Sequence, residues 1–420
     1  MSAPKDLETA PARPSNEALP VSRVVLAGLT AIGPVSFQIF LPALPAIQAG
    51  FGVEAGTAQL ALSLSMLGIA LATLAYGPLS DRFGRRPALI GGMILLIAGT
   101  LLCAAAPNIW VLIAGRIVQA AGGASGMVVS RAIVVDVYGR ERARAVLGGL
   151  MSVMVAGPLL ATPLGGVLAD TLGWRANFVA IALAAGAMLA YLLVRLPETR
   201  VVAAASSGGP LAGFSRLLRL PAFNGFALQS GFAMAAFMAF TTAAPYYLQH
   251  ALGIGATGFG LYATVVTLGF LAGSLSATRA ARRISTERLV LLGSAVALAA
   301  SLIAAALAFG GAWTVWALIG PAALVGYANG LSMPSAQAGA VSVLPELAGT
   351  ASGLSGFMGT MLGALATQVV GTLQNGTPYP IVAGMAVASA GALAAALLAT
   401  RASRPAPIAN ELVAQAKVAP

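Results

Sequence analysis

Apolar runs of about 20 residues recur along the whole chain, and they constrain its fold more than any other feature. An α-helix of this length crosses the hydrocarbon core of a bilayer, whereas the strands of a membrane barrel alternate apolar and polar residues. Within lipid, a helix satisfies its backbone N–H and C=O groups internally. The sequence therefore predicts an all-α integral membrane protein with twelve transmembrane helices, near residues 22–45, 57–78, 87–106, 108–131, 144–169, 174–196, 221–248, 256–279, 287–309, 312–335, 347–371 and 378–400.

Charged residues are scarce: they make up 8% of the 420 residues, while 58% are hydrophobic. Soluble domains carry roughly a quarter charged residues, so this chain could not cover a water-exposed surface of its size. The composition therefore predicts a lipid bilayer as the partner. The net charge of +11 is divided among small basic groups between apolar runs, which argues against a nucleic-acid partner. Cys103 is the only cysteine and there is one histidine, so we expect no disulfide within the chain, no metal site and no cofactor.

The arginines predict how the helices are oriented. With the N-terminus in the cytoplasm, almost all of the 21 arginines fall on the tails or on the connections after the second, fourth, sixth and eighth spans. Cytoplasmic loops are enriched in Lys and Arg, and a miscount by one span would scatter this pattern over both faces. We therefore expect both termini to be cytoplasmic. The two arginines outside the pattern are Arg116 and Arg175.

A polar stretch at residues 197–220 divides the spans into six and six, and it is predicted to be a flexible cytoplasmic linker. It separates an N-terminal half (22–196) from a C-terminal half (221–400), with a disordered cytoplasmic tail at 1–21 and a cytoplasmic tail at 401–420. The sequence LSDRFGRRP at 79–87 has a degraded counterpart, ATRAARRIS, at 277–285, six spans later. Two related six-helix halves are typical of secondary transporters.

The loop after the second span contains a long motif, Gly77-Pro-Leu-Ser-Asp81-Arg-Phe-Gly84-Arg85-Arg86. It resembles the G-x-x-x-D-x-x-G-R-R signature of the major facilitator superfamily. Supporting motifs follow in order: Leu41-Pro-Ala-Leu-Pro45, Arg116-Ile-Val-Gln119, Gly157-Pro158 and Gly165-Gly166. Together they are similar to the twelve-span drug:proton antiporters of the bicyclomycin/chloramphenicol-resistance (Bcr/CflA) branch. This resemblance implies a monomeric inner-membrane transporter that exports small amphipathic compounds by alternating access, in exchange for protons.

Elementary chemistry suggests a role for each residue of this loop. Gly77 allows close helix approach, Gly84 permits a tight turn, and Asp81 is suited to accept from the exposed N–H groups of another helix N-terminus. Arg85 can hold the Asp81 carboxylate, and Asp136 is a candidate third member of the cluster. The resemblance implies that the helix capped by Asp81 is the eleventh span, which makes the cluster a conformational latch that also includes Gly77, Gly84 and Arg86. The alternative is that the loop arginines only set topology: Arg82, Arg85 and Arg86.

Within the spans, Arg116 is the charged residue that lies deepest, and Gln119 is one helical turn further on. The resemblance places this arginine near the proton and substrate route, whereas a structural arginine would bond backbone carbonyls of the first span. Asn329 is a second cavity candidate, with helix–helix hydrogen bonding as its alternative. Gln38 stands where related sequences tend to have an acid. It is expected to bond either substrate or Arg116.

Because all twelve acidic residues fall on tails, loops or span ends, no carboxylate is placed mid-membrane to carry a proton. A boundary acid such as Asp136, another charge carrier and uncoupled transport all remain open. A metabolite importer or facilitator of the same fold is therefore the main alternative function. A membrane sensor or an enzyme is a weaker one, since the chain lacks a P-loop and metal-spaced His or Cys residues.

Small residues and prolines mark the fifth span, where Gly157, Ala161 and Gly165 recur every four residues. Such a stripe allows close helix contact and the prolines bend the helix. The resemblance associates this pattern with antiporters, although a generic kinked helix has similar features. The residues assigned to this antiporter-type pattern are Gly157, Pro158, Pro163, Gly165 and Gly166.

Aromatic and sulfur-containing residues of the seventh span suggest two further features. Tyr246, Tyr247 and His250 are cavity candidates near the outer end of the span, where an aromatic belt at the membrane surface is the default interpretation. Met234, Met238 and Phe237 could line an adaptable apolar pocket, or simply face lipid and neighbouring helices.

Overall fold

The computed structural model describes residues 22–199 and 210–403, with side chains described only in part between 139 and 155. The predicted tail at 1–21, residues 404–420 of the predicted tail at 401–420, and linker residues 200–209 lie outside this range. The helices are α1 (Arg23–Gln38), η1 (Leu41–Ala43), α2 (Leu44–Phe51), α3 (Ala55–Phe83), α4 (Arg85–Ala104), α5 (Ile109–Leu172), α6 (Arg175–Arg195), α7 (Pro210–Leu218), α8 (Pro221–Leu252), α9 (Ala256–Ala280), α10 (Thr286–Phe309), α11 (Val315–Ser342), η2 (Pro345–Leu347), α12 (Ala348–Thr372) and α13 (Tyr379–Ala402).

The predicted all-α membrane fold is confirmed. Eleven stretches of the described residues are helical, long enough and apolar enough to cross a bilayer. The remaining predicted span, 144–169, lies within α5, whose bounds include both the predicted fourth and fifth spans. Gly126 and Gly157 both pack on α1, against Leu29 and Val35 respectively. These two glycines are about 31 residues apart, roughly 46 Å in a straight helix, so α5 doubles back and its two arms run antiparallel.

The first predicted span, 22–45, is longer and more broken than expected. It continues to Phe51 as α1, η1 and α2. Pro42 and Pro45 have no N–H to donate, which interrupts the helical hydrogen bonds around η1. Gly52 then ends α2 with φ of +63°, a conformation that favours glycine.

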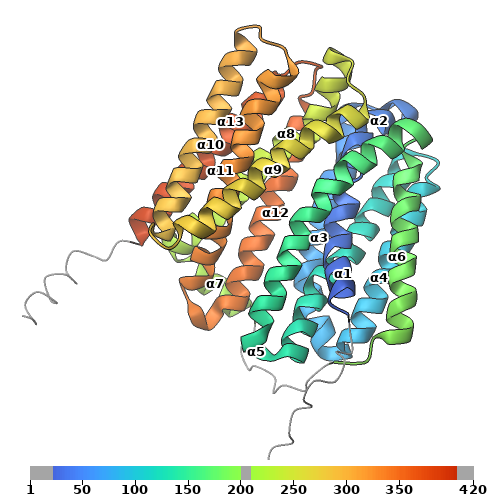
Figure 1. The fold of residues 1–420 in the computed structure, drawn as a ribbon, viewed down its shortest axis with the longest axis vertical. Helices are drawn as coiled ribbons and strands as arrows, with labels where there is room; N and C mark the ends of the chain where they lie inside the picture. Colours follow the sequence, from blue (N-terminus) through green and yellow to red (C-terminus); the bar gives the residue numbers. More distant parts are fainter. Residues whose placement is uncertain (1–21, 200–209, 404–420) are drawn as a thin grey trace, which may run out of the picture.

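The helices form two groups that lie side by side, α1–α6 (blue to green) and α8–α13 (yellow to red) in Figure 1. The groups meet where α3 packs on α12 and where the second arm of α5 packs on α9. We call the end of the bundle that holds the α3–α4 and α9–α10 connections the arginine-rich end, and the opposite end the arginine-poor end.

Part of the segment predicted as a flexible linker is a short helix, α7. Leu217 is fully buried, and Arg216 Nη2 lies 3.1 Å from Glu346 Oε1 in η2, just before α12. The apolar face of α7 thus docks on the C-terminal half, which gives these residues packing partners that a polar linker would lack.

Candidate functional site

At the arginine-rich end, the structure brings three of the predicted latch residues together. Arg85 Nη1 lies 2.6 Å from Asp81 Oδ1, and Arg85 Nε lies 2.9 Å from Asp136 Oδ2. The side chains of Arg85 and Asp136 are only 12% and 14% exposed, whereas Asp81 is 67% exposed. Solvent screens an exposed ion pair strongly, so the Asp136 partner holds Arg85 more firmly than Asp81 does.

Glu198 is a member of this end that the sequence interpretation missed. Its carboxylate accepts from the backbone N–H groups of Arg85 (2.8 Å) and Arg86 (3.1 Å), and so caps the N-terminus of α4. Gly84 has φ of +104°, and a Cβ there would lie 2.5 Å from Glu198 Oε2. Glycine is therefore required for both the turn and the approach of the carboxylate. The feature of the sequence that could have identified Glu198 is an acidic residue directly after the sixth predicted span.

Arg86 is also tied to α6, because its Nη2 donates to Leu193 O at 2.9 Å. The α3–α4 loop is thereby fastened to the end of α6 by both its backbone and a side chain.

Gly77 does not have its expected packing role in this conformation. A Cβ at Gly77 would meet no atom within 4 Å, so nothing there requires close approach. Asp81 pairs with Arg85 of its own half, although α12 had been expected to receive it. α3 packs closely on α12 at the other end, where a Cβ on Gly56 would lie 3.3 Å from the Thr372 Cα.

Hydrogen bonds that join the two halves gather at the arginine-poor end. Gln368 of α12 accepts from Ser63 Oγ at 2.8 Å and donates to Gly56 O at 3.1 Å, both on α3. Gln59 Nε2 donates to Thr242 O of α8 at 2.9 Å. These side-chain amides form a clasp across the interface, which we call the amide clasp.

Asp170, at the end of α5, adds a charged contact between the halves. Its carboxylate accepts from Ala256 N (3.3 Å), Thr257 N (2.8 Å) and Thr257 Oγ1 (2.7 Å) at the start of α9. The N-cap residue of α9 is Gly255, which has no side chain to perform this function. The second half thus receives its helix cap from the first. Sequence reasoning missed Asp170, whose signal was an acid at the end of the fifth span.

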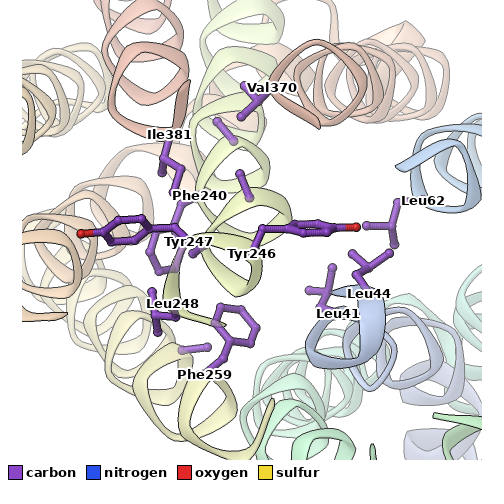
Figure 2. Close-up of a cluster of buried hydrophobic side chains, with 14 of the residues drawn as sticks. Leu41, Leu44, Leu62, Phe240, Tyr246, Tyr247, Leu248, Phe259, Val370 and Ile381 are labelled. Carbon is purple, nitrogen blue, oxygen red and sulfur yellow. The ribbon is translucent and has the colours of Figure 1, made fainter. Parts of the chain in front are cut away.

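A cluster of buried, mainly apolar side chains lies between the halves near the amide clasp (Figure 2), and we call it the plug. Its labelled members are Leu41, Leu44, Leu62, Phe240, Tyr246, Tyr247, Leu248, Phe259, Val370 and Ile381. Tyr246 and Tyr247 are 2% and 1% exposed, so the predicted aromatic belt is wrong for both. In Figure 2, Tyr246 points toward Leu44 and Leu62 of the N-terminal half, and Tyr247 points the opposite way. Their end of α8 runs between the two halves instead of along the lipid, which explains their burial. His250 remains exposed and stacks on Tyr246.

A small cavity of about 10 Å³, the space of about one water molecule, borders this plug and lies between the halves. Gln38 is one of its lining residues, and the Oε1 atom of Gln38 is buried without a hydrogen-bond partner in the described part of the chain. The full lining comes from α1, η1, α5, α8 and α9: Gln38, Leu41, Thr162, Phe237, Phe240, Thr241, Phe259, Ala263, Val266 and Thr267.

Arg116 of α5 is 1% exposed, and its side chain packs against α1. Its Nη1 donates to Gln119 Oε1 at 2.6 Å and to Ser36 O at 3.2 Å, and its guanidinium lies 4.3 Å from the Phe40 ring centre. The bond to Ser36 O is the carbonyl contact expected of a structural arginine. Its Nε and Nη2 have no hydrogen-bond partner among the described residues, so the buried charge is incompletely satisfied. The expected pairing of Arg116 with Gln38 is not formed.

Asn329 does not line the cavity. It is 3% exposed, and its Nδ2 donates to Ala233 O of α8 at 3.0 Å. The predicted cavity role is therefore wrong in this conformation, because a backbone carbonyl of the neighbouring helix already satisfies the amide.

The small-residue stripe of the predicted fifth span packs on α1. A Cβ on Gly157 would lie 2.9 Å from Val35 Cγ2, and one on Gly165 would overlap the Ile39 carbonyl. Pro158 and Pro163 lie within α5 between these contacts.

The next position, Gly166, packs on the Ala256 backbone of the other half, and Pro163 faces Gly260 of α9. The second arm of α5 therefore contacts both halves.

Methionines gather where the halves meet. Met66 and Met238, together with Ala364, are buried, and Met234 and Phe237 pack on them. This cluster unites α3, α8 and α12, and it includes the three residues for which an adaptable apolar pocket was considered.

Comparison with known proteins adds independent information. A family model described as Major Facilitator Superfamily matches residues 26–367. The chain is 28% identical over 363 residues to a chloramphenicol resistance protein of Pseudomonas aeruginosa, covering 86% of each. It is 29% identical to multidrug resistance protein D of Escherichia coli, covering 79% of this chain and 84% of that protein. A bacterial homologue of the human lysosomal transporter Spinster, solved in an inward-facing and occupied conformation, has a similar fold with a TM-score of 0.73 and 16% identity, covering 92% and 98% of the two chains.

Proposed function

Because this chain belongs to the major facilitator superfamily, and is thus a multi-pass membrane transporter and not an enzyme, we propose that it exports small amphipathic, drug-like compounds from the cytoplasm. Resistance proteins among its relatives support export of such compounds. The observation that carries the proposal is that the amide clasp, Asp170 and the plug join the two halves at the arginine-poor end. A cavity between the halves lies beside these contacts.

Alternating access requires contacts that form in one state and break in the other. The contacts at the arginine-poor end suit this requirement, since each joins side chains or helix ends of opposite halves. We place the arginine-rich end in the cytoplasm of a bacterial-type inner membrane, following the positive-inside rule. This conformation is then closed to the outside. Asp81, Arg85 and Asp136 form the cytoplasmic latch that engages the second half in the opposite state.

The test is a resistance profile in an efflux-deficient bacterial host across a broad compound panel. The wild-type chain raises resistance to some compounds, whereas Asp81→Asn lowers that resistance while the protein still inserts in the membrane. A profile identical to that of the empty vector would refute export. Wild-type resistance with Asp81→Asn would refute the latch.

Proton antiport is the second part of the proposal, with Asp136 as the boundary acid. Transport of a resistance substrate into everted vesicles is expected to collapse when an uncoupler is added. The absence of a mid-membrane acid favours a facilitator as the competing function. Transport that is indifferent to the uncoupler would establish that alternative. We further propose that the transporter acts as a monomer, which mass photometry of the detergent-solubilised protein measures directly.

A further inference from the structure

Five exposed arginines gather on the C-terminal half at the arginine-rich end, and we call them the arginine patch. Val290 of α10 and Ala399 of α13 belong to one buried cluster, so the start of α10 lies beside the end of α13 (Figure 1). The connection 281–285 joins the end of α9 to the same start of α10. The members of the arginine patch are Arg279, Arg282, Arg283, Arg288 and Arg401.

The protein supplies little negative charge to this patch. Within the described residues 22–199 and 210–403, none of the five guanidinium groups has an ion pair or a hydrogen bond. Within residues 275–292, four arginines and one glutamate, Glu287, give a net charge of +3. The partner of the arginine patch must therefore come from outside the described chain.

The related loop of the N-terminal half is neutralised differently. There, Arg85 pairs with the carboxylates of Asp81 and Asp136. When LSDRFGRRP at 79–87 is set against ATRAARRIS at 277–285, Arg279 stands at the position of Asp81. The second half has thus exchanged an acid for a base at this position, which makes the two cytoplasmic-type loops unlike in charge.

Exposed leucines lie directly below the arginine patch. On each of the three helices, one leucine is four residues from an arginine and deeper in the membrane: Leu275 and Arg279 on α9, Leu292 and Arg288 on α10, and Leu397 and Arg401 on α13. Residues four apart share one face of a helix. Because an exposed leucine of a membrane helix contacts acyl chains, each of these arginines lies above a lipid-facing surface, at the depth of the lipid headgroups.

We infer that the arginine patch binds the headgroup phosphate of an anionic phospholipid, whose acyl chains lie along the exposed leucines of α9, α10 and α13. Guanidinium groups bind phosphate oxygens through paired, charge-assisted hydrogen bonds. Clusters of four to eight basic residues beside a membrane helix attract anionic lipids. A zwitterionic lipid has the same phosphate, but its positive amine opposes the patch. This inference does not depend on what the protein transports.

Native mass spectrometry of the purified full-length protein in detergent tests this with three probes. Phosphatidylglycerol and phosphatidylcholine with identical acyl chains differ only in the headgroup, and glycerol 3-phosphate carries a phosphate without acyl chains. We expect phosphatidylglycerol to bind at least about tenfold more tightly than phosphatidylcholine, since each arginine near the phosphate contributes about fivefold. Glycerol 3-phosphate at the same concentrations is expected not to bind.

Variants assign the binding to the arginine patch. Arg288→Gln and Arg401→Gln should each weaken phosphatidylglycerol binding by about fivefold and leave phosphatidylcholine binding unchanged. Arg195→Gln is the matched control, because Arg195 is an exposed arginine in the last turn of α6, on the other half. It should leave phosphatidylglycerol binding unchanged. Scanning fluorimetry verifies that each variant is folded.

Equal binding of the two lipids by the wild-type protein would overturn the inference, as would glycerol 3-phosphate binding that Arg288→Gln weakens. Phosphatidylglycerol binding that both patch variants leave unchanged, or that Arg195→Gln weakens equally, would show that these arginines only set topology. None of these results would affect export, which the resistance profile tests separately.

Discussion

Asp170 offers the sharpest test of how the two halves are held together. Asp170→Asn preserves the size of the side chain but replaces one carboxylate oxygen by an NH₂ group and removes the negative charge. The wild-type carboxylate accepts three hydrogen bonds at the start of α9, two of them from backbone N–H groups. An amide has one oxygen for these donors and lacks the charge that a helix N-terminus favours.

The magnitude follows from the cost of losing a helix cap. Replacing a capping side chain costs about 0.5–2 kcal/mol, typically about 1 kcal/mol. Because Asp170 is exposed, we discount the charge contribution for solvent screening and take about 1 kcal/mol in total. Since Asp170 joins the halves, this cost falls on the conformation closed at the arginine-poor end. It corresponds to about a fivefold shift toward the open state.

The assay is a distance measurement between two spin labels by double electron–electron resonance. Glu54→Cys and Asn375→Cys place exposed labels on opposite halves at the arginine-poor end, in a Cys103→Ala background. In Asp170→Asn, we expect the ratio of long-distance to short-distance populations to rise about fivefold.

Asn108→Ala is the matched control, because Asn108 also caps a helix at this end but bonds Val111 N within its own half. It destabilises a helix end without separating the halves. An unchanged distance distribution in Asp170→Asn, or an equal shift in Asn108→Ala, would refute the reasoning.

Three further substitutions test other contacts. Gly84→Ala places a Cβ on a backbone with positive φ and against Glu198, so we expect the protein to lose about 1–3 kcal/mol of stability. Scanning fluorimetry should then show a lower unfolding temperature, and an unchanged temperature would contradict this. Gly165→Leu should lose about 1–3 kcal/mol or more by overpacking α5 against α1, whereas Gly186→Leu, at a position where a Cβ meets nothing within 4 Å, should unfold at the wild-type temperature. Arg116→Met removes an incompletely bonded buried charge, so we expect a stability within about 1 kcal/mol of the wild type. Resistance should fall by tenfold or more. A stable protein with full resistance would show that the guanidinium has no role in transport.

Much of the fold was accessible from the sequence because membrane insertion depends on each segment by itself. A run of about 20 apolar residues must form a helix in lipid, whatever its neighbours are. The pairing of Asp81 with Arg85 was equally accessible, since the two residues are four apart in the sequence and only the tight turn at Gly84 separates their helices. Glu198 was missed because the carboxylate and the N–H groups that it caps are more than 100 residues apart.

Tertiary structure alone decided which polar residues face a cavity and which are satisfied elsewhere. Asn329 and Gln38 have similar amides within predicted spans, yet one bonds a carbonyl of α8 and the other borders the cavity with an unpartnered oxygen. The aromatic-belt prediction likewise placed Tyr246 at a membrane surface, but its helix runs between the halves.

What the sequence determined by itself is the set of membrane helices, since the transfer of an apolar segment into lipid is a property of that segment. The tertiary structure decided where the halves touch, because contacts such as Asp170 with α9 and Gln368 with α3 depend on how distant helices pack. Packing between helices in lipid follows from shape and hydrogen-bond geometry more than from hydrophobicity, and a linear pattern of apolar residues does not encode it.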